Sequence, residues 1–273
     1  MDKINIALRA MGIEFSVKEE YVECDGKKQR GLVLSYEKSD VKNAFIPNDD
    51  FWSLSTYDQV SRIVEMEQKA KDKERLQYIN EYINNLTEEE YLRRTYPVLV
   101  DRKYYSEMMQ NNMTVYMPPS APAACVRFEH YIPYQEEVIP VGITNGTPFK
   151  FGPATLYRHA MENLKQEVIM TTGTNTADDA AFPFWSIKTK NDRNGAAGIL
   201  LPVVQEFFTE LFDYRDFHVL PLSTDELIII DPGVEVGDED IDKTLASMQT
   251  VIPKDRRLAE NAYLFKNGIL ISK

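Results

Sequence analysis

The richest pattern of apolar and polar positions in the chain lies between Phe184 and Asp231. Phe184–Thr189 alternates as a strand does, and Asn191–Gly195 is a cluster of turn-forming residues. Pro202 then interrupts a helical pattern, so the helix is either kinked there or begins there with the proline in its first turn. The apolar face of that predicted helix comprises Ala197, Leu200, Val204, Phe207 and Leu211.

Two strands follow the predicted helix. They are Phe217–Leu220 and Leu227–Ile230, joined through Pro221–Asp225. The second strand has no polar alternation, so we expect it at the centre of a sheet, with Ile228 and Ile229 buried on opposite faces. This strand–helix–hairpin unit predicts a hydrophobic core and says little about activity.

The preceding part of the chain predicts helices and one hairpin. The apolar spacing indicates an N-terminal helix, a hairpin, and then either one long helix or two. Thr87–Glu90 is a capping-box pattern and begins a further helix, which Pro97 must end. The earlier segments are Ile4–Met11, Phe15–Val22 paired with Gly31–Tyr36, Tyr57–Val64 and Leu76–Leu86.

The remaining segments alternate between strands and helices. We expect antiparallel strands at Ala124–Ile132 and Glu137–Ile143, and a final hairpin with a type I′ turn at Asn267–Gly268. One helix is predicted to begin at Pro153 and to carry an apolar stripe. A second is predicted to begin at Asp238–Asp240, because acidic side chains interact favourably with the positive end of the helix dipole. The stripes are Leu156, Ala160, Leu164 and Val168 in the first helix, and Ile241, Leu245 and Met248 in the second; Thr171–Asp179 is predicted to be a polar loop.

The predicted fold class is α+β, with a mixed, mainly antiparallel sheet flanked by helices and a helix-rich N-terminal portion. Three prolines within Met117–Pro122 favour an extended connector. This connector is read either as a domain boundary or as a loop inside one continuous domain. As a boundary it separates an N-terminal hairpin with helices, residues 1–117, from a C-terminal α+β sheet domain, residues 118–273.

Composition places the chain among ordinary globular proteins, because 43% of its residues are hydrophobic and 27% are charged. Cys24 and Cys125 are far apart and fit no metal-ligand spacing, so we expect free thiols in a reducing, cytoplasmic compartment. No apolar run approaches the ~20 residues that span a bilayer. The N-terminal stretch is too short and too interrupted by charge for a secretory signal.

The net charge of −12 is concentrated in one segment. Asp213–Asp242 holds ten acidic residues and one basic residue, Arg215. Such a segment repels a nucleic-acid backbone, so direct nucleic-acid binding is disfavoured and a protein partner with a basic surface is expected. Simple solubility is the competing explanation. The partner-binding candidates are Asp225, Glu226, Asp231, Glu235, Asp238, Glu239 and Asp240.

A search for catalytic motifs is mostly negative. The sequence contains no phosphate loop, no dinucleotide fingerprint and no metalloprotease or esterase motif. Ser223 with His218 and Asp225 would make a triad, but Ser and Asp are common turn formers in a hairpin loop. Asp225, Glu226 and Asp231 could offer oxygen ligands to Mg²⁺ or Ca²⁺, although an acidic rim is the favoured interpretation. We therefore expect no cofactor and no catalytic residue.

Four stretches and the order of elements resemble the uncharacterised bacterial YtpQ-like family and related domains of unknown function. The stretches are Arg94–Leu99, Phe151–Val168, Gly195–Pro202 and Phe217–Leu227. The resemblance covers most of the chain and is weakest before residue 90. That family has no established activity, so the resemblance implies no site residue.

Three functions are compatible with these observations. We expect a non-catalytic protein that binds another macromolecule through its acidic face. The first alternative is an acidic nucleic-acid mimic of the kind that mobile elements use against host defence. The second is a metal-dependent hydrolase or nuclease using strand-end carboxylates. Acids converging in a concave pocket would favour the enzyme, and acids spread over a convex face would favour the mimic.

Overall fold

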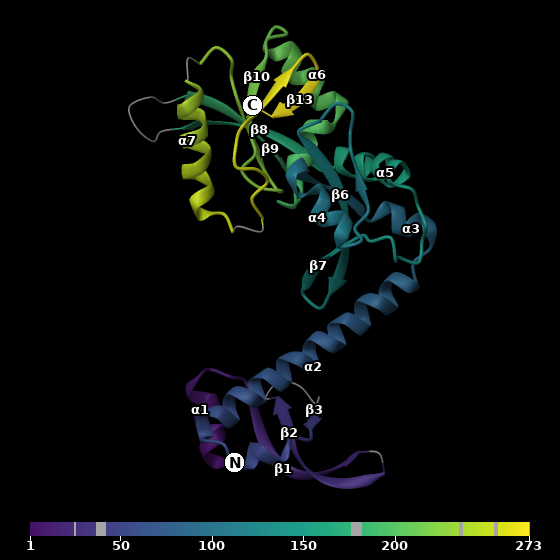
Figure 1. Ribbon diagram of the computed structural model, residues 1–273, viewed down its shortest axis with the longest axis vertical. Coiled ribbons are helices and arrows are strands. Elements are labelled where there is room, and N and C mark those ends of the chain that lie inside the picture. The colour runs from purple at the N-terminus through teal and green to yellow at the C-terminus, as the bar shows by residue number, and fades with distance from the viewer. Residues whose placement is uncertain (25, 37–41, 176–181, 235–236, 254–255, 273) are drawn as a thin grey trace. The chain divides into compact units, whose positions relative to one another are not determined.

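The computed structural model describes residues 1–273 except 25, 37–41, 176–181, 235–236, 254–255 and 273. The chain divides into two compact units, Met1–Tyr82 and Ile83–Lys273. The division falls near the end of helix α2 (Thr56–Asn84). Each unit combines helices with antiparallel strands (Figure 1), so the α+β class predicted from the sequence is the class observed.

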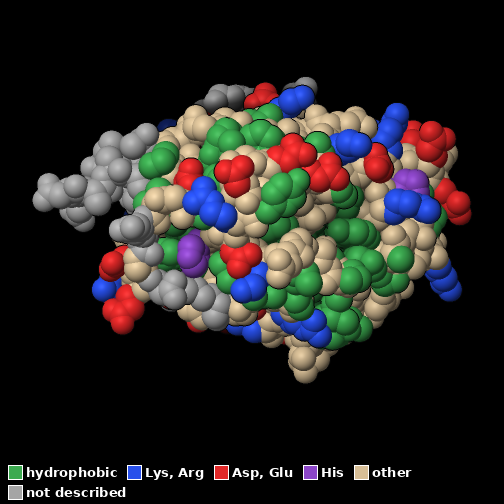
Figure 2. Space-filling model, turned by 90° about the horizontal axis from the view of Figure 1, so that it is seen from above, with side chains coloured by type: hydrophobic (Ala, Val, Ile, Leu, Met, Phe, Trp, Pro, Cys, Tyr) green, Lys and Arg blue, Asp and Glu red, His purple; other side chains and the backbone are tan. Residues whose placement is uncertain are grey.

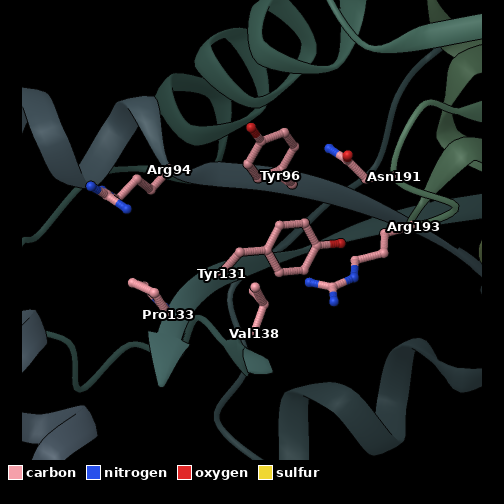
Figure 3. A pocket seen from close by; sticks show the side chains of 7 residues that line it. All are labelled: Arg94, Tyr96, Tyr131, Pro133, Val138, Asn191 and Arg193. Carbon is pink, nitrogen blue, oxygen red and sulfur yellow. The ribbon is translucent and has the colours of Figure 1, made fainter. Parts of the chain in front are cut away.

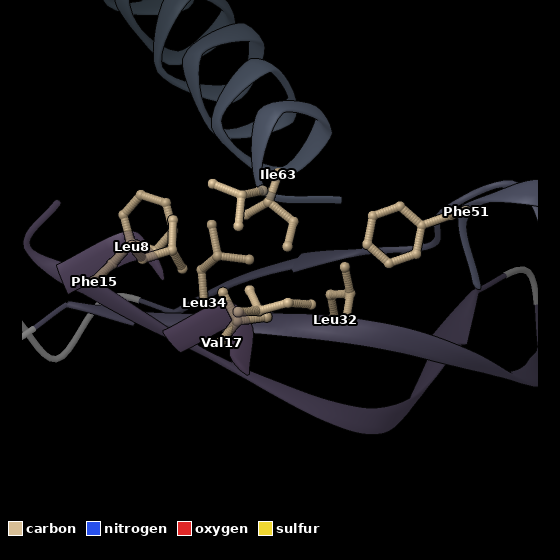
Figure 4. Packing of buried hydrophobic residues seen from close by; sticks show 9 residues of the cluster. Leu8, Phe15, Val17, Leu32, Leu34, Phe51 and Ile63 are labelled. Atoms are coloured by element: carbon tan, nitrogen blue, oxygen red, sulfur yellow. The ribbon is translucent and has the colours of Figure 1, made fainter. Parts of the chain in front are cut away.

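The first unit is a three-stranded antiparallel sheet packed against helices. Its strands are β1 (Phe15–Cys24), β2 (Lys27–Tyr36) and β3 (Lys42–Phe45), and they pair in that order. Helix α1 (Asp2–Ala10), the 3₁₀ helix η1 (Asp49–Ser53) and α2 complete the unit. Figure 4 shows the α2 side chain Ile63 above the apolar face of the sheet. Buried core residues include Leu8, Phe15, Val17, Leu32, Leu34, Phe51 and Ile63.

Helix α2 is continuous, so of the two sequence interpretations the single long helix is correct. Its charged middle contains ion pairs between residues four apart, Lys69 with Glu65 at 2.7 Å and Lys71 with Glu67 at 2.6 Å. Pairs at this spacing stabilise isolated helices by about 0.2–0.5 kcal/mol each.

A six-stranded antiparallel sheet forms one half of the second unit. Its strand order is β13-β12-β10-β11-β9-β8. Strand β11 lies inside the sheet, and all four of its residues are buried, with Ile228 3% and Ile229 0% exposed. The prediction of a central strand is confirmed. The bounds are β8 (Val168–Asn175), β9 (Phe182–Thr189), β10 (Phe217–Leu220), β11 (Leu227–Ile230), β12 (Tyr263–Lys266) and β13 (Ile269–Ser272).

A four-stranded antiparallel sheet forms the other half. Strand β6 (Ala124–Tyr134) is central to it and pairs with β4 (Thr95–Asp101), β5 (Val115–Tyr116) and β7 (Glu137–Gly142). The short elements η2 (Arg102–Tyr104) and α4 (Tyr105–Gln110) lie between β4 and β5 in the chain.

The capping box predicted at Thr87 is present and begins α3 (Glu88–Arg93). Pro97 does not end this helix, however, because the helix stops at Arg93 and Pro97 lies inside β4, opposite Phe128. This strand was not predicted, because a proline within an apolar run such as Thr95–Asp101 argues against a strand.

The predicted helix at Ala197–Leu211 is two elements. Gly195–Leu200 forms the 3₁₀ helix η3, and α6 (Pro202–Leu211) begins with Pro202 in its first turn. Of the two sequence interpretations of Pro202, the start of a helix is therefore correct and the kink is not. Every residue of η3 is buried, and a Cβ on Gly198 would approach the Val168 and Ile187 side chains to 2.8 Å. Glycine at this position allows η3 to pack against the sheet.

The other helices of the second unit are α5 (Pro153–Lys165), α7 (Asp238–Met248) and η4 (Gln249–Val251). Helix α5 ends before Val168, which begins β8, so the predicted stripe is one turn too long. Strand β8 also replaces the first part of the polar loop predicted at Thr171–Asp179; the rest of that loop lies outside the described residues. Pairing with β9 therefore places both Val168 and the start of the predicted loop in strand β8.

The proline-rich stretch Met117–Pro122 lies within the second unit. The backbone N–H of Leu270 donates to the Ser120 carbonyl at 2.8 Å, which ties this stretch to β13. In the described part of the chain, no helix is long and apolar enough to cross a membrane.

Candidate functional site

One face of the four-stranded sheet carries polar and aromatic side chains. Residues of β6 alternate, so that Arg127, Glu129 and Tyr131 share one face while Phe128 and Ile132 are buried on the other. Because cross-strand partners lie on the same face, the register adds side chains of both neighbours. Tyr96 of β4 pairs with Glu129, and Pro140 and Val138 of β7 pair with Tyr131 and Pro133.

A loop of the other sheet forms the wall of this face. Residues 190–194 follow β9, and Asp192 and Asn194 have left-handed backbones, with φ of 50° and 55°. The Thr189 hydroxyl closes the loop, since it donates to the Arg193 carbonyl at 2.8 Å and accepts from the Arg193 N–H at 2.9 Å. Gly195 ends the loop, where a Cβ would overlap Lys188 and the Asp225 carbonyl.

Together these elements enclose two adjoining hollows, of about 470 and about 370 Å³, which share Tyr131, Val138 and Arg193. We call the two hollows together the arginine–tyrosine groove. Figure 3 shows the Tyr131 ring in the middle of the first hollow, with Arg193 on one side and Arg94 at the far end. The first hollow is lined by Arg94, Tyr96, Tyr131, Pro133, Val138, Asn191 and Arg193, and the second adds Arg127, Glu129, Pro140, Asn194, Thr224 and Arg256.

The two tyrosines of the groove are held in place and protonated. Their rings stack with centroids 5.0 Å apart. The Tyr96 hydroxyl donates to Glu167 Oε1 at 2.7 Å, and burial followed by this bond raises the pKa of Tyr96 to about 12. Burial, and next the charge of Glu129, raise the pKa of Tyr131 well above its usual range. Both side chains are therefore neutral phenols near pH 7.

Four of the groove's polar residues are held by bonds to one another or to Asp225. Arg127 pairs with Glu129 at 2.8 Å, and the Asn194 amide also donates to Glu129 at 3.4 Å. Arg256 pairs with Asp225, whose other carboxylate oxygen accepts from the Asn194 backbone N–H at 2.9 Å. These bonds connect the loop wall to the sheet face.

Arg193 differs from them. Its guanidinium carbon lies 5.2 Å from the centre of the Tyr131 ring, and among the described residues no carboxylate forms an ion pair with it. The side chain is partly buried. The groove is lined by four arginines and one carboxylate, Glu129, and two further carboxylates, Asp225 and Glu167, bond to lining residues. Four guanidinium groups against three carboxylates leave a small positive local charge in a chain of net charge −12.

The predicted acidic candidates do not converge. Asp225 binds Arg256, Glu226 accepts from the Ser186 hydroxyl, and Asp231 accepts from the Gly233 N–H at 2.6 Å in a turn. Within the described ranges, no group of three or more His, Cys, Asp or Glu side chains could hold a metal ion. Of the three carboxylates, Asp225 alone borders the groove, through its bond to the lining residue Arg256.

The other acidic candidates belong to the start of α7 and the chain before it. Glu239 and Asp240 are exposed and lie near Lys243, at 3.9 and 3.5 Å. Glu235 lies outside the described residues, and Asp238 is the first residue of α7. Acidic and basic side chains are interspersed on the face shown in Figure 2. The triad residue Ser223 accepts a bond from the Asp225 N–H at 3.1 Å, as a turn former does.

The arginines and tyrosines of the groove were not among the residues predicted from the sequence. One signal was available: Arg127, Glu129 and Tyr131 alternate with the buried residues Phe128, His130 and Ile132 along the predicted strand. That alternation marks a face, but the loop carrying Arg193 reaches it only in the folded chain.

Comparison with protein-family models, with curated proteins and with solved structures returns no match. The resemblance to the YtpQ-like family therefore stays a prediction.

Proposed function

We propose that this chain is a binding protein, without catalysis of its own, whose second unit recognises an anionic ligand in the arginine–tyrosine groove. The observation that carries the proposal is the Arg193 guanidinium, which lies over Tyr131 with no carboxylate partner in the described part of the chain. A partly buried guanidinium gains most from an anion that can accept its fork of N–H donors.

The surroundings of Arg193 support binding in two ways. The loop that carries it is closed by Thr189 and bonded to Asp225, so little order has to be gained when a ligand binds. The neighbouring phenols stay protonated, because burial raises the pKa of both Tyr96 and Tyr131. They offer stacking surface and hydroxyl groups to a ligand, and they are unsuited to act as bases near pH 7.

The binding role is the one expected from the sequence, but the proposed site is the arginine–tyrosine groove in place of the acidic segment. The macromolecular partner with a basic surface, docking on the acidic segment, stays a prediction. Asp225 receives a different role, because it holds Arg256 and the loop at the edge of the groove. Neither the nucleic-acid mimic nor the metal-dependent hydrolase is favoured by an observation on the described residues.

The test uses inorganic pyrophosphate as a probe anion and isothermal titration calorimetry on the full chain at low salt. Arg193→Gln should weaken binding about tenfold or more, since a charge-assisted hydrogen bond contributes roughly 1.5–3 kcal/mol. Arg158→Gln is the matched control, because Arg158 is exposed on α5 and does not line the groove. Equal affinity of wild type and Arg193→Gln, or no binding by wild type, would contradict the proposal.

A further inference from the structure

The two hollows of the groove differ in chemistry. The first has an aromatic and apolar centre formed by Tyr96, Tyr131, Pro133 and Val138, and its polar lining residues are Arg94, Asn191 and Arg193. The second is polar and charged, with Arg127, Arg256, Asn194 and the carboxylate of Glu129 on its walls. They share Tyr131 and Arg193, so one molecule can occupy both. A ligand that fits this division has a flat apolar part and an anionic part joined to it.

We propose that this ligand is a single nucleotide, with its base in the first hollow against Tyr131 and its phosphate at the second hollow, bound by Arg193. Arg193 lines both hollows and has no carboxylate partner among the described residues, whereas Arg127 and Arg256, beside it, are paired with Glu129 and Asp225. The inference rests on the anion-binding function proposed above. Aromatic side chains stack on bases of any sequence, and arginine forks match phosphate oxygens. Volumes of about 470 and about 370 Å³ lie in the range of small-molecule sites, roughly 300–1,000 Å³.

Asn191 favours a base over a plain phenyl ring. Its Nδ2 donates to Glu167 Oε2 at 3.1 Å, and a carboxylate only accepts, so the amide orientation is set. The Oδ1 atom remains available as an acceptor, and Asn191 lines the first hollow. Asparagine reads base edges through its amide group, and an acceptor suits the exocyclic amino group of adenine, cytosine or guanine.

The charge of the chain favours a mononucleotide over a nucleic-acid strand. The groove is lined by four arginines, whereas the whole chain carries a net charge of −12. A strand would extend beyond the groove, and its further phosphates would meet an acidic protein. The phosphate of a single nucleotide fits within the groove, so none of its charge has to meet the acidic surface outside.

The experiment titrates the full chain with AMP, adenosine, inorganic pyrophosphate, O-phosphotyrosine and a single-stranded deoxyadenosine oligonucleotide, by calorimetry at fixed low salt. We expect AMP to bind about tenfold or more tightly than pyrophosphate, adenosine, phosphotyrosine or, per site, the oligonucleotide. Tighter binding of phosphotyrosine or of the oligonucleotide overturns the nucleotide assignment. Equal affinity for AMP and pyrophosphate overturns it as well but leaves the anion site intact. Binding of no anion at all removes both proposals.

Two substitutions at one position separate stacking from charge. Tyr131→Leu should weaken AMP about tenfold and leave pyrophosphate within twofold, because it removes the aromatic ring and its hydroxyl but changes no charge. Tyr131→Phe keeps the ring and should bind AMP nearly as wild type does. Arg193→Gln should weaken both ligands. An unchanged AMP affinity in a folded Tyr131→Leu variant would show that no base stacks there; a circular dichroism spectrum confirms folding for each variant.

Discussion

The guanidinium carbon of Arg193 lies 5.2 Å from the centre of the Tyr131 ring. Tyr131 belongs to β6 of the four-stranded sheet, and Arg193 to the loop after β9 of the six-stranded sheet. The contact therefore joins the two halves of the second unit. Its geometry depends on the loop closure by Thr189 and on the anchor that Asp225 provides.

Substitution of Gly195 should destabilise the second unit. A Cβ on Gly195 would overlap the Lys188 backbone and the Asp225 carbonyl, so Gly195→Ala should cost about 2–3 kcal/mol, as overpacking does. Gly146→Ala is the control, because its added Cβ would lie 3.7 Å from the Thr144 hydroxyl, an ordinary contact. Urea unfolding measures both. A Gly195→Ala protein as stable as the control would show that the loop can shift at little cost.

Substitution of Asp225 should loosen the groove wall. Asp225→Asn removes the charge that pairs with Arg256 and weakens the bond to the Asn194 N–H, which should lower the free energy of unfolding by about 1–2 kcal/mol. Anion affinity should fall with it. Glu239→Gln, at an exposed α7 position, should change stability by less than about 0.5 kcal/mol. Equal melting curves for the two variants would refute a structural role for Asp225.

A charge in the central strand should be among the costliest changes. Ile229 is fully buried opposite Trp185, so Ile229→Asp should lose roughly 3–5 kcal/mol. Ile269→Asp is the control, because Ile269 lies on edge strand β13 and is 40% exposed. In a Trp52→Phe background, Trp185 is the one remaining tryptophan and its fluorescence reports the second unit. A melting temperature within about a degree of the parent would falsify the burial of this side chain.

Stability should fall in mild acid because of His130. This residue is 1% exposed, and burial, followed by the charge of Arg94, lowers its pKa from 6.5 to about 4. The unfolded chain then binds the proton more readily than the folded chain, so stability decreases as pH falls from about 6.5 to about 4, by up to roughly 3 kcal/mol.

The pH prediction is checked by urea unfolding at pH 7 and pH 4.5. His130→Phe removes the titrating ring and should flatten the difference between the two values. A wild-type and a His130→Phe protein with the same loss of stability would assign the pH dependence to carboxylates instead.

The sequence by itself determined the elements whose signals are local. The capping box at Thr87 needs only residues of one helical turn. The final hairpin turns at Asn267 and Gly268, which both have positive φ, as the predicted type I′ turn requires. The unbroken apolar run Leu227–Ile230 was sufficient to predict a strand buried on both faces, without knowledge of its neighbours in the sheet.

The tertiary structure decided what depends on partners distant in sequence. Strand β4 exists because Thr95–Asp101 pairs with β6, and Val168 joins β8 because β9 lies beside it. The groove is of this kind as well. Asp225 looked like part of an acidic surface, but the fold turns it toward Arg256 and leaves Arg193 to face Tyr131. The residue types can be read from the sequence, whereas the direction in which each charged side chain points depends on strand register and loop closure.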